Sequence, residues 1–296
     1  MILKMGNEKL LLLIDANSLL HRAYHALPPL TAKDGSPAGA LYGLSGALLK
    51  IFKERRPEYL AAAFDRPEPT RRSREYAAYK GTRPKVEEEL VSQLIAARDL
   101  FQNFGIAYFE KPGYEADDLI ASLAEKFGEA PDLKILILSS DQDLLQLVDG
   151  NRIQVEAPVK GISNTVVYDS VKVEEKFGVP PRKIPDYKGL VGDQSDNIPG
   201  VPGIGPKTAA QLIGKYGSVE NLIQQFREMG ISESKIAEKL RGNEEQALLS
   251  KKLAKLESVA LEVALDELAF HLDKNRIAEC LGRLGFASLA SRLSNG

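Results

Sequence analysis

Four short apolar runs alternate with longer segments of helical periodicity, and this alternation most constrains the fold of the chain. The runs are LLLLI at 10–14, YLAAAF at 59–64, IAYF at 106–109 and KILIL at 134–138. Between them, apolar residues recur three and four positions apart, as in Leu41, Leu44 and Leu48. Buried apolar strands joined by crossover helices are typical of a parallel sheet covered on both faces, so the pattern predicts an α/β fold.

The pattern of apolar residues along the sequence changes near Pro180. Beyond that point short helical patterns follow one another, no strand pattern appears, and Gly and Pro cluster in IPGVPGIGPK. We therefore expect an α/β domain over residues 1–180 and a helical domain over residues 181–296.

Composition narrows the class of protein. With 296 residues, of which 44% are hydrophobic and 27% charged, the chain can bury a large core. Its single cysteine excludes an internal disulfide and a zinc site with several thiolates, which favours a reducing cytoplasmic setting. No apolar run near the start is long enough for a membrane span or a signal peptide. The net charge of -2 gives no general attraction to polyanions, so such a partner would be bound by local charge clusters.

Carboxylates follow each predicted strand. The residues beyond the carboxyl ends of parallel strands form the usual ligand site of an open α/β sheet. The acids at these positions are Asp15, Asp65, Glu115, Asp117, Asp118, Asp141 and Asp143. Taken singly, each is explained as a loop residue or as a cap that complements the helix dipole. Agreement among several strand ends favours one shared acidic site.

Seven acids at one edge need counter-charge, because neighbouring carboxylates raise one another's pKa. Carboxylate oxygens without His or Cys favour Mg²⁺ or Mn²⁺ over Zn²⁺, and two such ions can drive hydrolysis of a phosphodiester. Asp193 and Asp196 form a second acidic cluster in VGDQSDNIPG, which the letters alone also allow to be a plain polar turn. Neither acidic segment has the Gly and Glu spacing of an EF-hand loop.

Residues 66–85, RPEPTRRSREYAAYKGTRPK, combine many cations with tyrosines and lack an apolar stripe. The relevant side chains are Arg71, Arg72, Arg74, Lys80, Arg83, Lys85, Tyr76 and Tyr79. A solvated surface is the simpler interpretation. Because the segment leaves directly from Asp65, it also fits a path for a single strand, with cations for phosphates and rings for bases.

The segment GVPGIGPKTAAQLIGKYGS at 200–218 resembles a Walker A loop but fails its pattern. Pro206 separates Gly205 from Lys207, and no strand precedes the loop. We interpret it as a glycine hairpin that opens a helix at Thr208 and offers backbone N–H groups to a phosphate, with a plain interhelical turn as the alternative. His21, His25 and His271 have no Ser or Cys partner, and we interpret the first two as ordinary helix or loop residues.

These segments together resemble a known family. In chain order, IDANSLLHRAYHALPPL, AAFDRP, YKGTRP, GYEADDL, SSDQDLLQLV and VGDQSDNIPGVPGIGPKTA are similar to motifs of the 5′-nuclease domain of bacterial DNA polymerase I and of stand-alone 5′-3′ exonucleases and flap endonucleases. The resemblance covers nearly the whole chain. It implies a PIN-like nuclease core with a helical arch at about 66–90 and a helix-hairpin-helix clamp at about 198–218.

The resemblance also implies roles for individual residues. The implied metal ligands are Asp15, Asp65, Glu115, Asp117, Asp118, Asp141, Asp143, Asp193 and Asp196. The first seven of these, with Lys80 and Arg83, form the implied catalytic set. The implied DNA-binding residues are Arg71, Arg72, Arg74, Tyr79, Lys80, Arg83, Gly203, Gly205, Lys207 and Thr208. Two Mg²⁺ or Mn²⁺ ions at the acids and K⁺ at the hairpin are the implied cofactors.

The implied activity is metal-dependent hydrolysis near the 5′ end of flap, nicked or branched DNA in replication and repair, including the removal of RNA primers. The expected partner is duplex DNA with a 5′ flap or nick. The protein is expected to act as a monomer in the bacterial cytoplasm and not to bind a membrane. Whether the chain stands alone or is fused to a DNA polymerase stays open. A PIN-type ribonuclease would share the acids without needing the hairpin, and a non-catalytic DNA clamp would need only the hairpin and arch.

Overall fold

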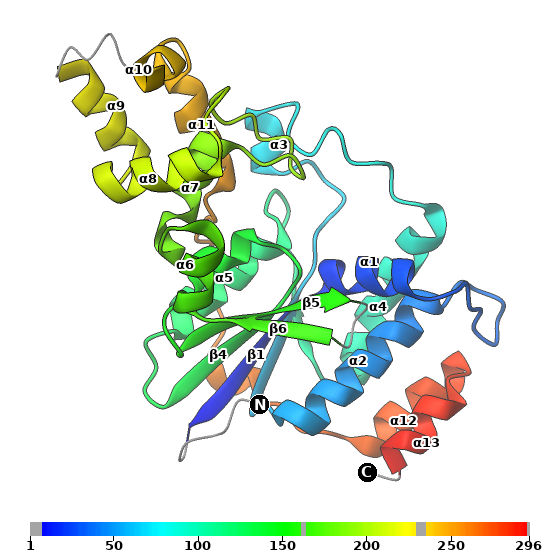
Figure 1. The fold of residues 1–296 in the computed structure, drawn as a ribbon. Coiled ribbons are helices and arrows are strands. Elements are labelled where there is room, and N and C mark those ends of the chain that lie inside the picture. Colours follow the sequence, from blue (N-terminus) through cyan, green and yellow to red (C-terminus); the bar gives the residue numbers. More distant parts are fainter. Residues whose placement is uncertain (1–7, 161–163, 229–234, 295–296) are drawn as a thin grey trace.

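The structure is a computed structural model that describes residues 8–160, 164–228 and 235–294 (Figure 1). Its centre is one six-stranded sheet with strand order β3-β2-β1-β4-β5-β6. The four predicted apolar runs are confirmed as strands, namely β1 (Lys9–Asp15), β2 (Tyr59–Ala63), β3 (Ala107–Phe109) and β4 (Leu133–Leu138). All four pair in parallel, as their continuous apolar sequences predicted.

Two further strands were not predicted. β5 (Ile153–Lys160) extends the parallel order, and β6 (Asn164–Tyr168) closes the edge in the antiparallel direction. The sheet is therefore mixed rather than wholly parallel. Both strands lie toward one edge and mix polar with apolar residues, so they lack the unbroken apolar run that marks a strand buried on both faces.

Helices cover both faces of the sheet because side chains of a strand alternate in direction. Leu10, Leu12 and Ile14 of β1 face the first core, with helices α1 (Ala16–Ala26), α2 (Gly39–Arg55) and α4 (Glu88–Asn103). Leu11 and Leu13 face the second core, which contains the apolar side of α5 (Ala116–Phe127). Because β1 to β5 pair in parallel, their carboxyl ends lie at one edge of the sheet.

The predicted arch contains little helix. Between β2 and α4 only α3 (Arg71–Glu75) is helical, and turns and extended chain make up the rest. Thr70 caps α3 by accepting a hydrogen bond from the Ser73 N–H, at 3.3 Å.

A group of helices beyond residue 169 has its own small core. It comprises α6 (Ser170–Phe177), α7 (Ile184–Val191), α8 (Pro206–Tyr216), α9 (Val219–Glu228), α10 (Lys235–Leu240) and α11 (Glu244–Ala254). A 3₁₀ turn at Pro181–Lys183 precedes α7, and two more lie outside this group at Asp143–Leu147 and Leu265–Leu268. Leu190, Leu212 and Leu222 lie in this core. Helix α8 begins at Pro206, two residues before the expected Thr208, because proline's fixed φ suits the first helical position.

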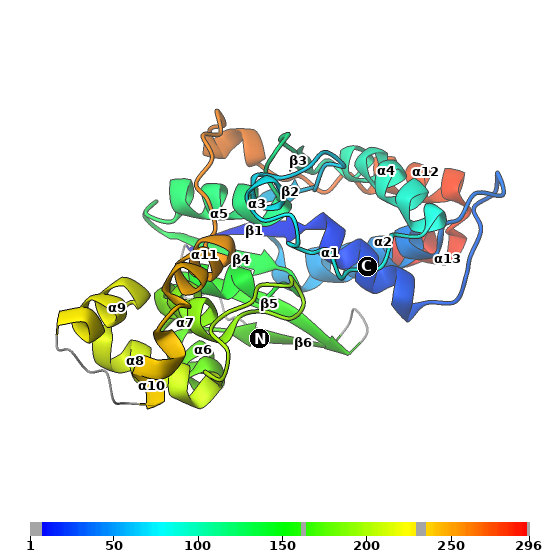
Figure 2. The same cartoon turned by 90° about the horizontal axis from the view of Figure 1, so that it is seen from above.

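The chain beyond α11 returns to the α/β core. Ala269 forms a bridge with Tyr59, and helices α12 (Lys274–Leu284) and α13 (Ala287–Ser294) place Leu281 and Leu289 in the first core. Figure 2 shows these two helices on the opposite side of the molecule from α8–α10. The expected helical domain at 181–296 is therefore not one packing unit, since its last part covers α2 and α4. Within the described residues, no helix is both long enough and apolar enough to span a bilayer.

Candidate active site

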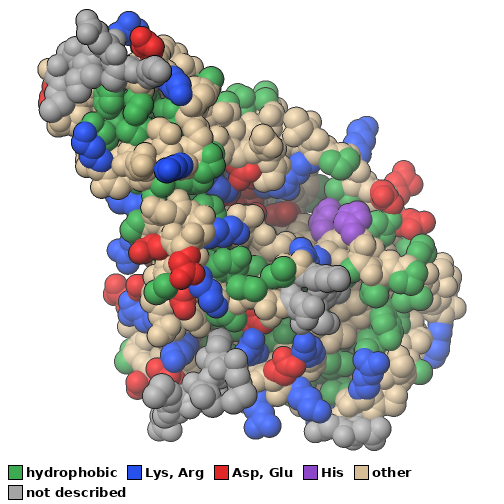
Figure 3. All heavy atoms as spheres, viewed as in Figure 1, with side chains coloured by type: hydrophobic (Ala, Val, Ile, Leu, Met, Phe, Trp, Pro, Cys, Tyr) green, Lys and Arg blue, Asp and Glu red, His purple; other side chains and the backbone are tan. Residues whose placement is uncertain are grey.

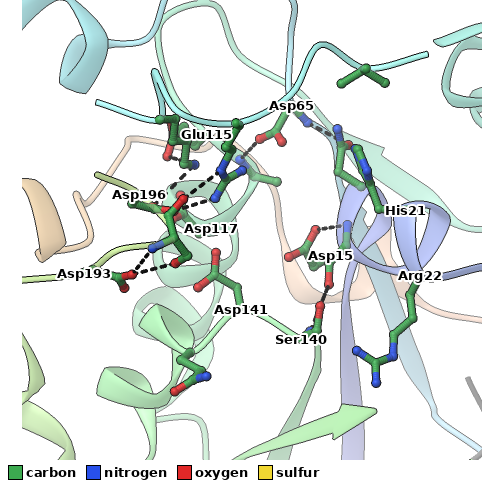
Figure 4. Close-up of a pocket in the computed structure, with 18 of the residues that line it drawn as sticks. Asp15, His21, Arg22, Asp65, Glu115, Asp117, Ser140, Asp141, Asp193 and Asp196 are labelled. Carbon is green, nitrogen blue, oxygen red and sulfur yellow. Dashed lines mark hydrogen bonds and ion pairs between the residues drawn. The ribbon is translucent and has the colours of Figure 1, made fainter. Parts of the chain in front are cut away.

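A cavity of about 1120 Å³ lies beyond the carboxyl ends of the strands. Figure 3 shows acidic side chains at the bottom of a hollow here, with histidine on its rim, and Figure 4 shows the residues close up. Seven of the nine predicted carboxylates line it, together with Lys80 and Arg83; these acids are Asp15, Asp65, Glu115, Asp117, Asp141, Asp193 and Asp196. The structure thus brings together acids that are up to about 180 positions apart in the sequence.

Asp15 is the last residue of β1, and Asp65 follows the end of the neighbouring strand β2 by two residues; both line the cavity. Asp15 accepts hydrogen bonds from the Ser18 N–H at 2.9 Å and from Ser139 Oγ at 2.6 Å, so it also caps α1. Burial, and then the neighbouring Asp65, raise the pKa of Asp15 to about 7. Burial likewise raises the pKa of Asp65, although Asp65 accepts a hydrogen bond from the Ala116 N–H at 2.7 Å. Hydrogen bonds thus hold the carboxyl groups of Asp15 and Asp65 in place, but they compensate only part of the cost of burying a negative charge.

The acidic side chains of the segment GYEADDL point in two directions. Asp117 lines the cavity, and burial raises its pKa well above the ordinary value. Asp118 turns away and receives both terminal nitrogens of Arg72, at 2.9 and 2.6 Å, and the Glu257 N–H at 2.9 Å. Successive helical residues point about 100° apart, so these two carboxylates do not share a direction.

Asp118 therefore has a different position from the one expected of a metal ligand. It does not line the cavity, and one of its oxygens also accepts from the Glu115 N–H at 3.2 Å. This bond caps the start of α5, as the simpler interpretation of the acidic cluster predicted. The other two acids of the segment, Glu115 and Asp117, do face the cavity.

Cations of the arch pair with the carboxylates. Lys80 Nζ lies 2.9 Å from Glu115 Oε2, and Arg83 Nη2 lies 2.5 Å from Asp196 Oδ1. Burial acts to raise the pKa of Glu115, but Lys80 and Arg72 outweigh it and lower this pKa below its ordinary value. The Lys80 backbone N–H also donates to the Asp196 carbonyl at 2.8 Å, so the arch is joined to the second acidic cluster.

Two residues expected to face DNA are buried instead. Arg72 and Tyr79 are 6% and 5% exposed, and the Tyr79 hydroxyl donates to Glu115 at 3.0 Å and Asp196 at 3.1 Å. In this structure neither offers a surface to a base or a phosphate. By contrast, Arg71 and Arg74 of the same helix are exposed, as expected. Residues 66–85 contain no apolar stripe from which these inward and outward positions could have been told apart.

Lys188 of α7 is a functional candidate that the sequence analysis missed. It is 5% exposed and forms ion pairs with Asp143 and with Asp193, whose Oδ2 lies 2.5 Å from its Nζ. Burial raises the pKa of Asp143 to about 7, against the effect of Lys188. Asp143 does not line the cavity but contacts two residues that do, through its ion pair with Lys188 and through the hydrogen bond of 2.8 Å from its N–H to Asp141. A single lysine inside a short helix has no distinctive spacing, so only the fold reveals it.

The loop that carries Asp193 and Asp196 is closed at its base. Asp193 and Ile198 exchange two backbone hydrogen bonds of 2.8 Å each. A Cβ at Gly200, whose φ is 63°, would lie 2.3 Å from the Gly192 nitrogen, so the two chain segments approach too closely for a side chain. This contact fixes where the second acidic cluster enters the cavity.

Helix α1 contributes a basic side to the cavity through His21, Arg22 and His25. Both histidines are helix residues, which the interpretation of them as ordinary helix or loop residues allowed, but they also line the cavity. Burial, and then His25 and Arg83, lower the pKa of His21. Their four-residue spacing places both on one helix face, which is the signal that could have indicated a shared role.

The cavity acids are chemically suited to a hard divalent cation, but the described side chains are not arranged as a metal site in this structure. Carboxylate oxygens are the ligands that Mg²⁺ and Mn²⁺ prefer. Yet within residues 8–160, 164–228 and 235–294, no three His, Cys, Asp or Glu side chains are grouped closely enough to hold a metal ion. In this arrangement Lys80, Arg83 and Lys188 pair with carboxylate oxygens that a cation would otherwise use.

The glycine hairpin lies outside the cavity, at the amino end of α8 (Figure 1). Gly203 has a φ of 80°, Gly205 precedes the first helical turn, and both are exposed with Lys207. Thr208 is half-buried beside them. The Gly203 carbonyl accepts a hydrogen bond from Lys239 at 2.7 Å, so part of its polar surface is already used.

Two family models match adjacent parts of the chain. Residues 10–178 match the 5′-3′ exonuclease N-terminal resolvase-like domain, and residues 179–276 match the 5′-3′ exonuclease C-terminal SAM fold. Together they cover the sheet, the arch and the helix-hairpin-helix region.

Among curated proteins, the chain is similar to a 5′-3′ exonuclease of Aquifex aeolicus. The two are 40% identical over 283 residues, which is 95% of this chain and 94% of that protein. It is also 40% identical to DNA polymerase I of Caldicellulosiruptor bescii and 38% identical to that of Bacillus subtilis, over 96% and 98% of this chain. The chain spans 33% of the length of each of these two polymerases.

Solved structures share the fold at low sequence identity. T5 5′-exonuclease with bound zinc superimposes with a TM-score of 0.68 at 20% identity, over 97% of both chains. The catalytic core of Rad2 in complex with a DNA substrate superimposes with a TM-score of 0.64 at 17% identity, over 97% of this chain and 91% of that one.

Proposed function

The chain belongs to the 5′-3′ exonuclease family, and from this premise we propose that it is a structure-specific 5′ nuclease. Its substrate is DNA with a 5′ flap, nick or branch, and its reaction is hydrolysis of a phosphodiester at or near that 5′ end. The observation that carries the proposal is the cavity in which seven carboxylates meet arch cations that are able to bind phosphate.

The residues that would hold divalent cations are the cavity acids, in two groups. Asp15, Asp65, Glu115, Asp117 and Asp141 come from the sheet edge, and Asp193 and Asp196 come from the loop after α7. When bound there, Mg²⁺ or Mn²⁺ ions supply an activated water and stabilise the leaving oxygen. Asp118 and Asp143 support this set from outside the cavity, through Arg72 and Lys188.

Lys80 and Arg83 bind the phosphate in this proposal. Each is ion-paired with a cavity carboxylate, Glu115 or Asp196. If those carboxylates held a cation, both side chains would be available to a phosphate at the mouth of the cavity. Their positive charge would then lie beside the phosphate, where charge develops during hydrolysis.

The duplex binds at the hairpin rather than in the cavity. The exposed amino end of α8, with Gly203, Gly205 and Lys207, offers N–H groups and one cation to a phosphate, with K⁺ as a bridging ion. The cleavage site thus combines the strand ends within residues 1–180 with Asp193 and Asp196 of the loop after α7, and the hairpin at about 198–218 holds the DNA that is cleaved.

A 5′-labelled flap substrate tests the proposal. We expect cleavage in Mg²⁺ and none in chelator, and we expect Asp117→Asn to lower the cleavage rate at least about 100-fold. Glu125→Gln, an exposed residue of the same helix, is the matched control and retains the wild-type rate. Cleavage that persists in chelator, or an Asp117→Asn variant with normal turnover, would refute the proposal. An RNA flap cleaved faster than the DNA flap would indicate a ribonuclease instead.

A further inference from the structure

A second cavity, of about 1060 Å³, lies at the opposite end of the sheet. Lys9 lines this cavity and Asp15 lines the first, and both belong to β1. The two residues are six positions apart in an extended strand, which corresponds to roughly 20 Å. The cavity is bounded by the end of α2, the start of β2, residues 269–274 and α13, and we call it the basal groove.

The floor of the basal groove is apolar. Phe52 and Phe270 pack with their ring centroids 4.7 Å apart, and Leu289 and Leu293 adjoin them. Leu272 lies at the edge with 41% of its surface exposed. The other four side chains are at most 8% exposed, so the apolar area whose burial by a ligand would be favourable lies mainly at Leu272.

The rim of the groove is strongly basic. Six cationic side chains line the groove against two carboxylates, in a chain whose net charge is -2; they are Lys9, Lys50, Lys53, Arg56, Lys274 and Arg292. Figure 3 shows several Lys and Arg side chains on the lower part of the molecule. One of the two carboxylates, Glu58, already accepts a hydrogen bond from the Leu10 N–H at 2.8 Å. Within the described part of the chain, Lys53, Arg56 and Lys274 form no ion pair.

The shape and burial of the groove discriminate among anionic ligands. A duplex does not enter a concave apolar pocket, and a single strand needs ring faces on which bases stack. Phe52, Tyr59 and Phe270 are each at most 8% exposed, so none offers such a face. A small inorganic anion would pair with the cations of the rim but leave the apolar floor exposed to solvent. A peptide that carries both carboxylates and a bulky apolar side chain satisfies rim and floor together.

We propose that the basal groove is a docking site for a short acidic peptide segment of a partner protein. Its apolar side chain lies against Leu272 at the edge of the floor, and its carboxylates pair with Lys53, Arg56 and Lys274 at the rim. Because the groove shares no residue with the cleavage cavity, such a partner is held without obstructing the substrate.

Fluorescence anisotropy with a labelled peptide of four aspartates followed by leucine and phenylalanine tests this proposal. We expect wild-type protein to bind it at low salt. Lys53→Glu combined with Arg56→Glu should weaken binding at least about tenfold, as should replacing the peptide's phenylalanine with serine. The matched control is Lys172→Glu with Lys176→Glu, two exposed lysines of α6, and should change the affinity less than about twofold.

Flap cleavage by each variant shows whether the fold is intact, since none of these residues lines the cleavage cavity. If the groove variant loses cleavage as well, the serine-substituted peptide decides the question with wild-type protein. The proposal is overturned if wild-type protein does not bind the peptide or if the serine peptide binds equally well. It is also overturned if the groove variant keeps its affinity. A single-stranded oligonucleotide that binds more tightly and loses affinity in the same variant would make the groove a nucleic-acid surface instead.

Discussion

Replacing Arg72 with methionine should destabilise the protein strongly, because its guanidinium is the buried partner of several oxygens. Arg72 is 6% exposed and donates to both oxygens of Asp118, to Glu115 at 3.1 Å, and to the Leu253 and Lys255 carbonyls at 3.0 and 3.1 Å. Its removal leaves Asp118 buried without its main counter-charge. Breaking a buried pair in this way costs about 3–5 kcal/mol.

Arg71, the preceding residue, is the matched control. Its side chain is 55% exposed and pairs with Glu257 at 2.6 Å on the surface. Solvent-exposed pairs contribute about 0–1 kcal/mol, so Arg71→Met should change the free energy of unfolding by no more than that. Urea denaturation of both variants in chelator, followed by circular dichroism, measures the difference directly.

The double variant Arg72→Met/Asp118→Asn tests the cause of the loss. Removing the charge of Asp118 should restore part of the stability, with a coupling energy of about 0.5–3 kcal/mol. The reasoning is refuted if Arg72→Met costs less than Arg71→Met. It is also refuted if Arg72→Met lowers DNA affinity while the free energy of unfolding stays at the wild-type value, since Arg72 would then be a DNA contact after all.

Three further predictions follow from the site. In chelator at pH 8, Asp15→Asn should be more stable than wild type by on the order of 4 kcal/mol, because the buried carboxyl has a folded pKa of about 7 against an ordinary 3.8. Burial disfavours the charged form of Asp15, so the stability advantage of Asp15→Asn over wild type should shrink as the pH falls from 7 towards 4 and the wild-type carboxyl becomes protonated. Urea titrations measure this difference, and a difference that grows on acidification would contradict the prediction. Gly200→Ala should lower the free energy of unfolding by more than about 1 kcal/mol, because its Cβ would meet backbone at 2.3 Å, whereas Gly214→Ala, with open space in mid-helix, should raise it by about 0.5–1 kcal/mol. Lys207→Ala should weaken binding of all duplex sequences alike and reduce the slope of log affinity against log salt by about 1, whereas an unchanged slope would remove Lys207 from the phosphate contacts.

Local periodicity was enough to predict the centre of the fold. The runs at 10–14 and 134–138 are buried on both faces, so their apolar residues are continuous and mark strands without further information. Helices α2 and α5 repeat apolar residues at helical spacing, and both lie where this pattern placed them. β5 and β6 were missed because a strand near the sheet edge needs no unbroken apolar run.

Local sequence did not predict the packing of the C-terminal helices. The pattern after Pro180 indicates helices, but it does not indicate which surface their apolar sides cover. In the structure, Ile277 and Leu289 complete the core against α2, far from the hairpin that precedes them in the chain. Such a partner is chosen by long-range complementarity between apolar surfaces, which has no local sequence signal.

The same division holds for the site. By itself the sequence determined that acids follow the strands, because the carboxyl ends of parallel strands share one edge whatever the details of packing. Only the tertiary structure decided that Asp117 faces the cavity while Asp118 is bound by Arg72, and that Lys188 joins Asp143 to Asp193. The reason is physical: the direction of a side chain follows from its helical register, and the partner of a buried charge follows from which distant segment approaches it.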